Sequence, residues 1–190
     1  MKVLFKTLAA LLIFVGLSTV ASAQAIPDSS RIGAAAEIGI PTADIGSRYT
    51  MSVGASLRYD LYLAHKSYLT ASVGFNEFLL ADGATTTQTA ILNYPVHPLQ
   101  TMPIKLGYKY LMKHFYVQME FGETLLLNQT TQYATKSHAF TYAPQFGLIF
   151  NTKNHNFIDA GLRYEGVSSF YNDTEKYNFW ALHFAYAFKW

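Results

Sequence analysis

The sequence predicts an all-β fold, an eight-stranded antiparallel up-and-down transmembrane β-barrel. Eight segments alternate large apolar residues with small or polar ones, which is the period of a β-strand. After residue 23 no apolar run reaches the roughly 20 residues that a membrane-spanning helix needs, so only strands are left to cross a membrane. The connections alternate between short and long, which is typical of a barrel with tight turns at one end.

The first four segments are residues 33–40, 49–61, 67–78 and 102–110. In the first, alanine and isoleucine alternate with glycine and Glu37. In the second, apolar residues alternate with serine, glycine, Arg58 and Asp60. The third sets leucine, valine and phenylalanine against threonine, serine and asparagine, and the fourth sets isoleucine, leucine and tyrosine against Lys105, glycine and Lys109. Each strand therefore has one large apolar face and one small or polar face.

The last four segments are residues 114–123, 138–150, 156–167 and 177–190. The fifth and sixth alternate aromatic and aliphatic residues with glutamine, glycine, threonine and, in the fifth, Glu120. The seventh alternates apolar residues with Asp159, Arg163 and Glu165. Pro144 lies in the middle of the sixth, where its missing N–H predicts a local bulge or bend. Closure of the barrel requires the eighth segment to pair with the first.

The connections differ in length in a regular way. The short ones are residues 62–66, 111–113 and 151–155, and the longer ones are residues 41–48, 79–101, 124–137 and 168–176. In outer-membrane barrels short turns face the periplasm and longer loops face the exterior. The even number of strands also returns the C-terminus to the side of the N-terminus.

Residues 1–23 are predicted to be a secretory signal peptide, and residues 24–190 the barrel domain. Lys2 and Lys6 precede an apolar run, which is followed by the small-residue cleavage pattern of residues 21–23. Removing the two lysines lowers the net charge from +2 to zero, so no basic patch indicates a nucleic acid partner. The chain has no cysteine, so closure of the barrel would have to replace disulfides.

The polar lead, residues 24–31, is expected to be mobile. The small or polar faces behind it carry nearly all the charged residues of the strands, with glycine, serine, alanine and threonine between them. We expect these faces to line a narrow lumen in which opposite charges pair. The predicted polar network of the lumen comprises Glu37, Arg58, Asp60, Lys105, Lys109, Glu120, Asp159, Arg163, Glu165, His183 and Lys189, with Gln118 and Gln145 beside them.

Aromatic residues of the apolar faces fall near the two ends of the strands, with aliphatic residues between them. Two aromatic girdles around an aliphatic band are typical of a membrane barrel. The girdle expected at the short-turn end is Tyr59, Tyr110, Phe115, Phe150, Phe157, Phe188 and Trp190. The girdle expected at the long-loop end is Phe75, Phe121, Phe140, Tyr142, Tyr164 and Trp180.

These patterns resemble the small outer-membrane β-barrels common in Bacteroidetes and, more distantly, the eight-stranded barrels of the OmpX and OmpA type. The stretches that carry the resemblance are residues 33–41, 53–59, 103–110, 140–147 and 161–166. The resemblance implies a location in the cell outer membrane and no particular activity. It also implies that the C-terminal strand, which ends at Trp190, is the signal read by the barrel-assembly machinery.

The sequence contains no phosphate-binding glycine loop, zinc-protease motif or nucleophile elbow. We therefore expect no catalytic residue, no cofactor and no metal site. The histidines do not cluster, and we expect His183 to belong to the lumen network. Some outer-membrane barrels are lipid-modifying enzymes with a serine and a histidine at the membrane rim. Ser137 and His138 are the one rough candidate here, and a chance pair is the favoured interpretation.

The leading hypothesis is a monomeric outer-membrane barrel with a structural or surface-interaction role. It would contact outer-membrane lipid, have a closed polar lumen, and display the long loops 79–101 and 124–137, where an unknown surface ligand could bind. Three alternatives remain open. They are a small pore, a lipid-modifying outer-membrane enzyme, and a soluble periplasmic ligand-binding barrel of the lipocalin type, whose apolar faces would point inward around a cavity.

Overall fold

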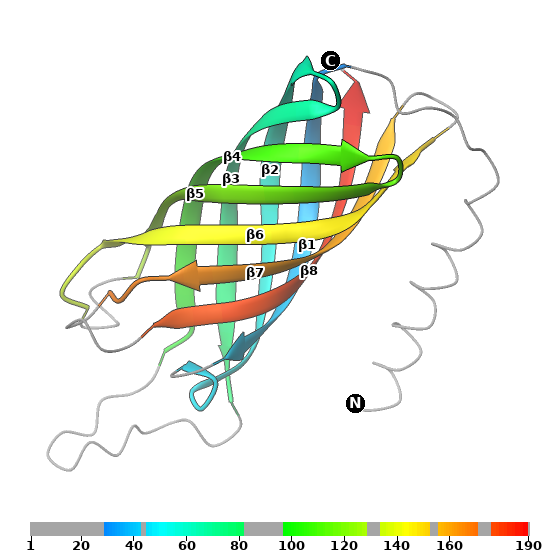
Figure 1. Cartoon of the computed structure of the whole chain (residues 1–190). Coiled ribbons are helices and arrows are strands. Elements are labelled where there is room, and N and C mark those ends of the chain that lie inside the picture. The colour runs from blue at the N-terminus through cyan, green and yellow to red at the C-terminus, as the bar shows by residue number, and fades with distance from the viewer. Residues whose placement is uncertain are drawn as a thin grey trace, which may run out of the picture.

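Eight antiparallel strands form a closed barrel in the computed structural model, which describes residues 29–42, 45–81, 97–128, 134–152, 156–170 and 176–189. Each strand pairs with the next in the chain, and the first pairs with the last (Figure 1). The predicted fold is therefore confirmed. The strands are β1 (Arg31–Thr42), β2 (Tyr49–Ala64), β3 (Ser67–Leu80), β4 (Leu99–Met112), β5 (Phe115–Leu126), β6 (His138–Asn151), β7 (Phe157–Val167) and β8 (Tyr177–Lys189).

The short turns and the long loops lie at opposite ends of the barrel. In Figure 1 the β2–β3 and β4–β5 turns lie at the end near the C-terminus, and the longer connections leave the other end. We call these the turn end and the loop end. The predicted signal peptide, most of the first long loop and the centre of the second lie outside the described residues. Within the described part of the chain, no helix is long and apolar enough to cross a membrane.

The seam between β1 and β8 closes the barrel. The register runs without interruption from Arg31 opposite Lys189 to Thr42 opposite Asn178. Apart from Arg31, Glu37 and His183, the inner side of this seam is made mostly of glycine and alanine, which are packed closely. A Cβ on Gly33 would lie 2.9 Å from the Cβ of Ala187, so a larger residue there would push the two strands apart. The predicted pairing of the first and last strands is confirmed.

The bulge expected at Pro144 is absent, and β6 continues through this residue. The register between β5 and β6 continues through Pro144, which lies opposite Met119. On the other side, the ladder to β7 lacks pairs at residues 143 and 144 and resumes in the same register at Gln145. In an antiparallel sheet one residue directs its N–H and C=O toward the same neighbour. A proline therefore costs pairing with one neighbouring strand and leaves the other ladder intact.

The register of the seam can be tested by cross-linking, because the chain has no native cysteine. Ala36 and Phe184 lie directly opposite each other across the seam, at a Cα separation of about 5 Å that suits a disulfide. The variant A36C/F184C is expected to form an intramolecular disulfide that changes the mobility of the denatured chain on a non-reducing gel. The control A36C/L182C places the sulfurs on diagonal positions, and equal cross-linking of both variants would contradict the register.

Candidate functional site: the charged lumen and the apolar wall

Within the described part of the chain, the barrel interior contains ten buried charged side chains, five acidic and five basic. They project from β1, β2, β4, β5 and β7, because alternate residues of these strands face inward. Opposite charges can compensate one another there, which buried charges require. With one histidine they form what we call the charged lumen: Arg31, Glu37, Arg58, Asp60, Lys105, Lys109, Glu120, Asp159, Arg163, Glu165 and His183.

Asp159 on β7 is the acceptor at the centre of one group of ion pairs. Its Oδ2 accepts from Arg58 Nη2 at 2.6 Å and from Lys109 Nζ at 2.8 Å. Both cations also contact Asp60, with Arg58 Nε 3.0 Å from Oδ1 and Lys109 Nζ 3.4 Å from Oδ2. Two acids and two bases thus form a neutral group that connects β2, β4 and β7.

Glu37 on β1 is the centre of the second group. Its Oε1 lies 2.8 Å from Arg163 Nη1 and 2.9 Å from His183 Nδ1. Arg163 reaches further, with its Nη2 3.5 Å from Glu120 Oε2 and its Nε donating to Gln145 at 2.8 Å. These contacts connect β1, β5, β6, β7 and β8.

A third, separate ion pair joins Lys105 on β4 to Glu165 on β7. The neutral amide side chains of the predicted network lie beside the charges. Gln145 Nε2 donates to the hydroxyl of Tyr116. Gln118 is buried opposite Gln145 in the ladder, and its side chain makes no hydrogen bond to the described residues.

His183 connects the two larger groups, and its contacts define its tautomer. Its Nε2 lies 3.2 Å from Nη1 of Arg58. A guanidinium nitrogen has no acceptor capacity, so Arg58 must donate and Nε2 must be unprotonated. The proton therefore lies on Nδ1 and is donated to Glu37. His183 is consequently neutral, and the five acids and five bases balance without it.

Two charged residues differ from the sequence prediction. Lys189 belongs to the predicted network, but it is exposed at the end of β8. Arg31, which was expected in a mobile lead, lies opposite it in the seam and is 1 % exposed. Arg31 donates to the hydroxyl of Tyr68 at 2.6 Å, and its guanidinium carbon lies 4.0 Å from the ring centroid of Phe157. Phe157 therefore points inward and does not belong to the outer girdle.

Buried apolar residues close both ends of the charged lumen. The turn-end cluster consists of Tyr68, Leu111, Tyr116, Ile149, Phe157 and Ala187. The loop-end cluster consists of Ile45, Tyr49, Phe78, Leu99, Leu126, Ala139, Val167, Phe170, Tyr177, Phe179 and Ala181. Nζ of Lys109 lies 4.1 Å from the ring centroid of Tyr116, so the charged lumen directly contacts the turn-end cluster. Neither cluster was predicted from the sequence. Their strand residues lie on the same inward face of each strand as the polar residues, near the strand ends.

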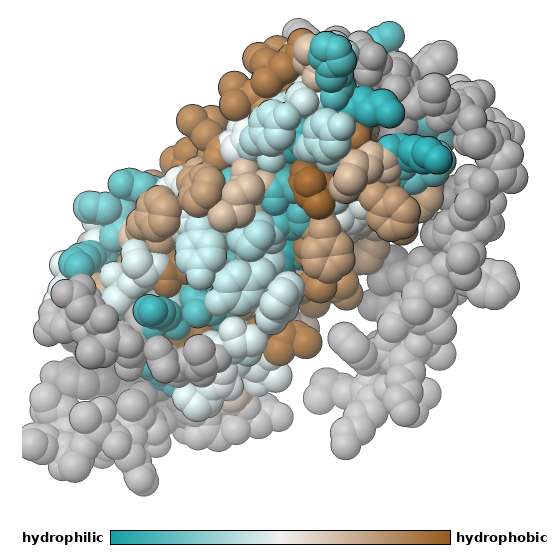
Figure 2. Space-filling view, in the orientation of Figure 1, coloured by the Kyte–Doolittle hydropathy of each residue, from teal (hydrophilic) through white to brown (hydrophobic). Residues whose placement is uncertain are grey.

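The outer wall of the barrel is apolar. Leu57 is 60 % exposed and Leu106 is 63 % exposed, and many further large apolar side chains of the strands are exposed around the barrel. Figure 2 shows brown and pale side chains over most of the visible wall, with teal side chains mainly toward the two ends. A water-exposed surface of this extent would be unstable, because soluble monomers rarely expose large continuous apolar patches. The wall is therefore a surface for lipid.

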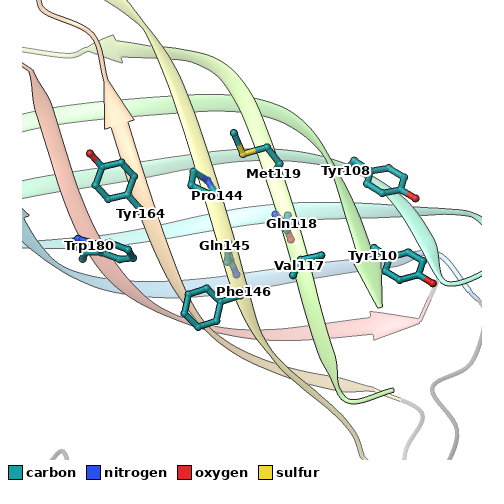
Figure 3. Close-up of a pocket in the computed structure, with 10 residues that line it drawn as sticks. All are labelled: Tyr108, Tyr110, Val117, Gln118, Met119, Pro144, Gln145, Phe146, Tyr164 and Trp180. Carbon is teal, nitrogen blue, oxygen red and sulfur yellow. The ribbon is translucent and has the colours of Figure 1, made fainter. Parts of the chain in front are cut away.

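The wall has a shallow groove of about 410 Å³ around Pro144. Aromatic rings of Tyr108, Tyr110, Tyr164 and Trp180 surround the small proline ring (Figure 3). The side chains of the girdle at the loop end also pack on one another, as in the Tyr164–Trp180 pair with ring centroids 5.0 Å apart. The groove lies on the wall, and Gln118 and Gln145, which lie beside the charges of the lumen, are also among its lining residues.

The other sequence candidates do not form a site in the described part of the chain. Ser137 precedes β6 and His138 is its first residue; both are exposed, and their side chains form no hydrogen bond with each other among the described residues. No group of three or more potential metal ligands lies together within the described ranges.

A closed antiparallel barrel with paired charges inside and an apolar wall outside is the architecture of a transmembrane β-barrel. No family model matches the chain, and no curated protein matches it in sequence. Among solved structures, the barrel is similar to neisserial surface protein A, with 13% identity and a TM-score of 0.50 over 85% of this chain and 97% of that chain. It is also similar to the Yersinia pestis outer membrane protein Ail in a phospholipid bilayer nanodisc, with 15% identity and a TM-score of 0.50 over 85% of this chain and 100% of that chain.

At these identities the likeness establishes the fold, which is that of the small eight-stranded outer-membrane barrels. The apolar wall supplies the second argument, because it needs lipid around it. The fold and the wall together locate the barrel in the bacterial outer membrane, as the sequence predicted.

The charged lumen makes a direct prediction about stability. Asp159→Asn removes the negative charge that two buried cations share, and an uncompensated buried charge costs about 3–5 kcal/mol. The free energy of unfolding, measured by urea titration of the refolded barrel in detergent micelles, should fall by about that amount. Lys189→Gln is the control, because this lysine is exposed and its loss should change stability by less than about 0.5 kcal/mol. Similar losses in both variants would contradict the assignment.

The tautomer of His183 can be observed directly. Long-range ¹H–¹⁵N correlation spectra of the folded barrel at neutral pH should show a protonated Nδ1 and an unprotonated Nε2. Arg58→Gln can donate an amide N–H in place of the guanidinium, so the same tautomer is expected in that variant. A protonated Nε2 in the wild-type barrel would contradict the contact with Arg58.

Proposed function

We propose that this protein is a closed, monomeric outer-membrane barrel that acts as a structural scaffold for its exterior loops. The observation that carries the proposal is the charged lumen, whose acids and bases balance and which lies between two apolar clusters. An eight-stranded barrel is just wide enough for side chains to fill it. Long charged side chains that reach across the lumen and bind one another leave little room for solute.

The interior argues against the small-pore alternative. A conducting pore of this size needs a continuous wet path, and water enters apolar constrictions poorly. Here the path would have to cross the loop-end cluster, then the ion pairs of Asp159 and Glu37, and then the turn-end cluster. Opening it would break buried ion pairs, each of which is expensive to separate.

The orientation of the faces argues against the soluble carrier. A lipocalin-type barrel would direct its apolar faces inward around a ligand cavity, whereas this barrel directs its charges inward and its large apolar residues outward. The lipid-modifying enzyme is disfavoured because no hydrogen bond joins the side chains of Ser137 and His138 among the described residues. We therefore propose that the protein is not an enzyme and uses no cofactor.

The remaining elements of the proposal follow from the sequence. Residues 1–23 would direct export, and the C-terminal strand ending at Trp190 would be read by the barrel-assembly machinery. The long connections 79–101 and 124–137 would face the exterior, where an unknown surface ligand could bind them. The similarity to barrels of Bacteroidetes also stays a prediction, because the solved structures reported above come from Neisseria and Yersinia.

The proposal predicts a barrel that is stable in detergent and does not conduct. On a gel, the mature chain should migrate differently before and after boiling in detergent, because the closed barrel resists unfolding until it is heated. In planar bilayers the same preparation should give no stable, discrete conductance steps. Identical migration before and after boiling would contradict the barrel. Discrete conductance steps would favour the small pore over the closed scaffold.

A further inference from the structure

The turn end of the barrel carries a ring of exposed basic side chains that neither the lumen nor the wall explains. We call it the turn-end rim, and it consists of His65, Lys66, Lys113, His114 and Lys189. Among the described residues at this end, no acidic side chain is exposed. The nearest acids, Asp60 and Asp159, are buried in the charged lumen and are already paired there.

The backbone of the two turns makes this composition unusual. His65 and Lys66 have φ values of 47° and 66°, and Lys113 has a φ of 58°. Two-residue hairpin turns favour Asn-Gly or Asp-Gly because the left-handed region suits those residues. Long side chains adopt it rarely and at some cost in strain. Lys66 and Lys113 therefore present cationic side chains at turn tips where glycine or asparagine would be less strained.

The position of the rim suggests which partner these cations meet. Tyr110, Phe115 and Phe188 are exposed on the wall just inside the rim, at the level where a girdle meets lipid headgroups. Lysine side chains at this level reach into the headgroup layer with their stems on apolar surface. The loop end differs, because exposed Lys136 and Lys176 occur there together with exposed Glu123.

We propose that the turn-end rim binds the phosphate groups of anionic phospholipids in the adjacent leaflet of the membrane. This inference rests on the proposed membrane-barrel function. Each lysine near an anionic surface adds an attraction equivalent to about a fivefold gain in affinity. Lipid phosphates bound around one end of the barrel would hold the barrel at a defined depth. They would also give its two ends different lipid preferences.

The experiment measures which lipids stay with the barrel. The protein is incorporated into nanodiscs of equal amounts of phosphatidylglycerol and phosphatidylcholine, and the lipids that remain bound on release are counted by native mass spectrometry. The wild type should retain phosphatidylglycerol in preference to phosphatidylcholine. K66Q/K113Q should lower that preference about 25-fold, and K66R/K113R should restore it because arginine keeps the charge.

The matched control is K136Q/K176Q, which removes the same charge from the loop end and should leave the preference unchanged. An unchanged preference in K66Q/K113Q, or an equal loss in both double variants, would overturn the inference. Inorganic phosphate should not displace the lipid, and displacement would show a site for a free anion instead. The gel shift on boiling is measured for each variant. A wild-type barrel that shows the gel shift but no lipid preference would therefore contradict lipid binding by the turn-end rim and leave the proposed function intact.

Discussion

The contact of Glu37 with His183 and Arg163 is the interaction on which closure depends. Around the Glu37–His183 contact, the inner side of the β1–β8 seam is mostly glycine and alanine, so apolar side-chain packing contributes little there. Glu37 and His183 lie directly opposite each other across this seam, and Arg163 joins them from β7. A charge-assisted hydrogen bond in a region shielded from water is strong, and a broken one leaves a costly unpaired group. The seam thus combines close backbone approach with one polar connection.

The two apolar clusters determine how strongly the lumen charges interact. They cover the ends of the lumen, so the ion pairs between them are removed from bulk water and screened little by salt. In such surroundings an unpaired ion is expensive, and equal numbers of acids and bases become a requirement. Arg31, at the turn end, is the fifth base and makes the numbers of buried acids and bases equal. It occupies the inner side of the seam opposite the exposed Lys189 and lies between aromatic rings.

The alternation of the strands was enough to predict the barrel and its closure. Ten of the eleven residues that it assigned to the polar network are buried. Each of these depends on side-chain parity, which a sequence shows directly. The errors lie at strand ends and at proline. Arg31 has the same parity as Glu37, so extending the first strand by one inward residue would have found it. Lys189 has the correct parity but lies beyond the covered part of the lumen. Pro144 affects one ladder only, which a strand viewed alone does not reveal.

The ion pairs of the lumen join strands that are distant in the chain. Arg58 on β2 and Lys105 on β4 both bind acids of β7, and Glu37 on β1 binds Arg163 of β7. A sheet that had entered the membrane before β7 arrived would therefore carry several of these charges without partners, facing hydrocarbon. Such an intermediate is too costly to accumulate. Insertion of this barrel must accordingly be a concerted event, in which the strands enter the bilayer as the cylinder closes.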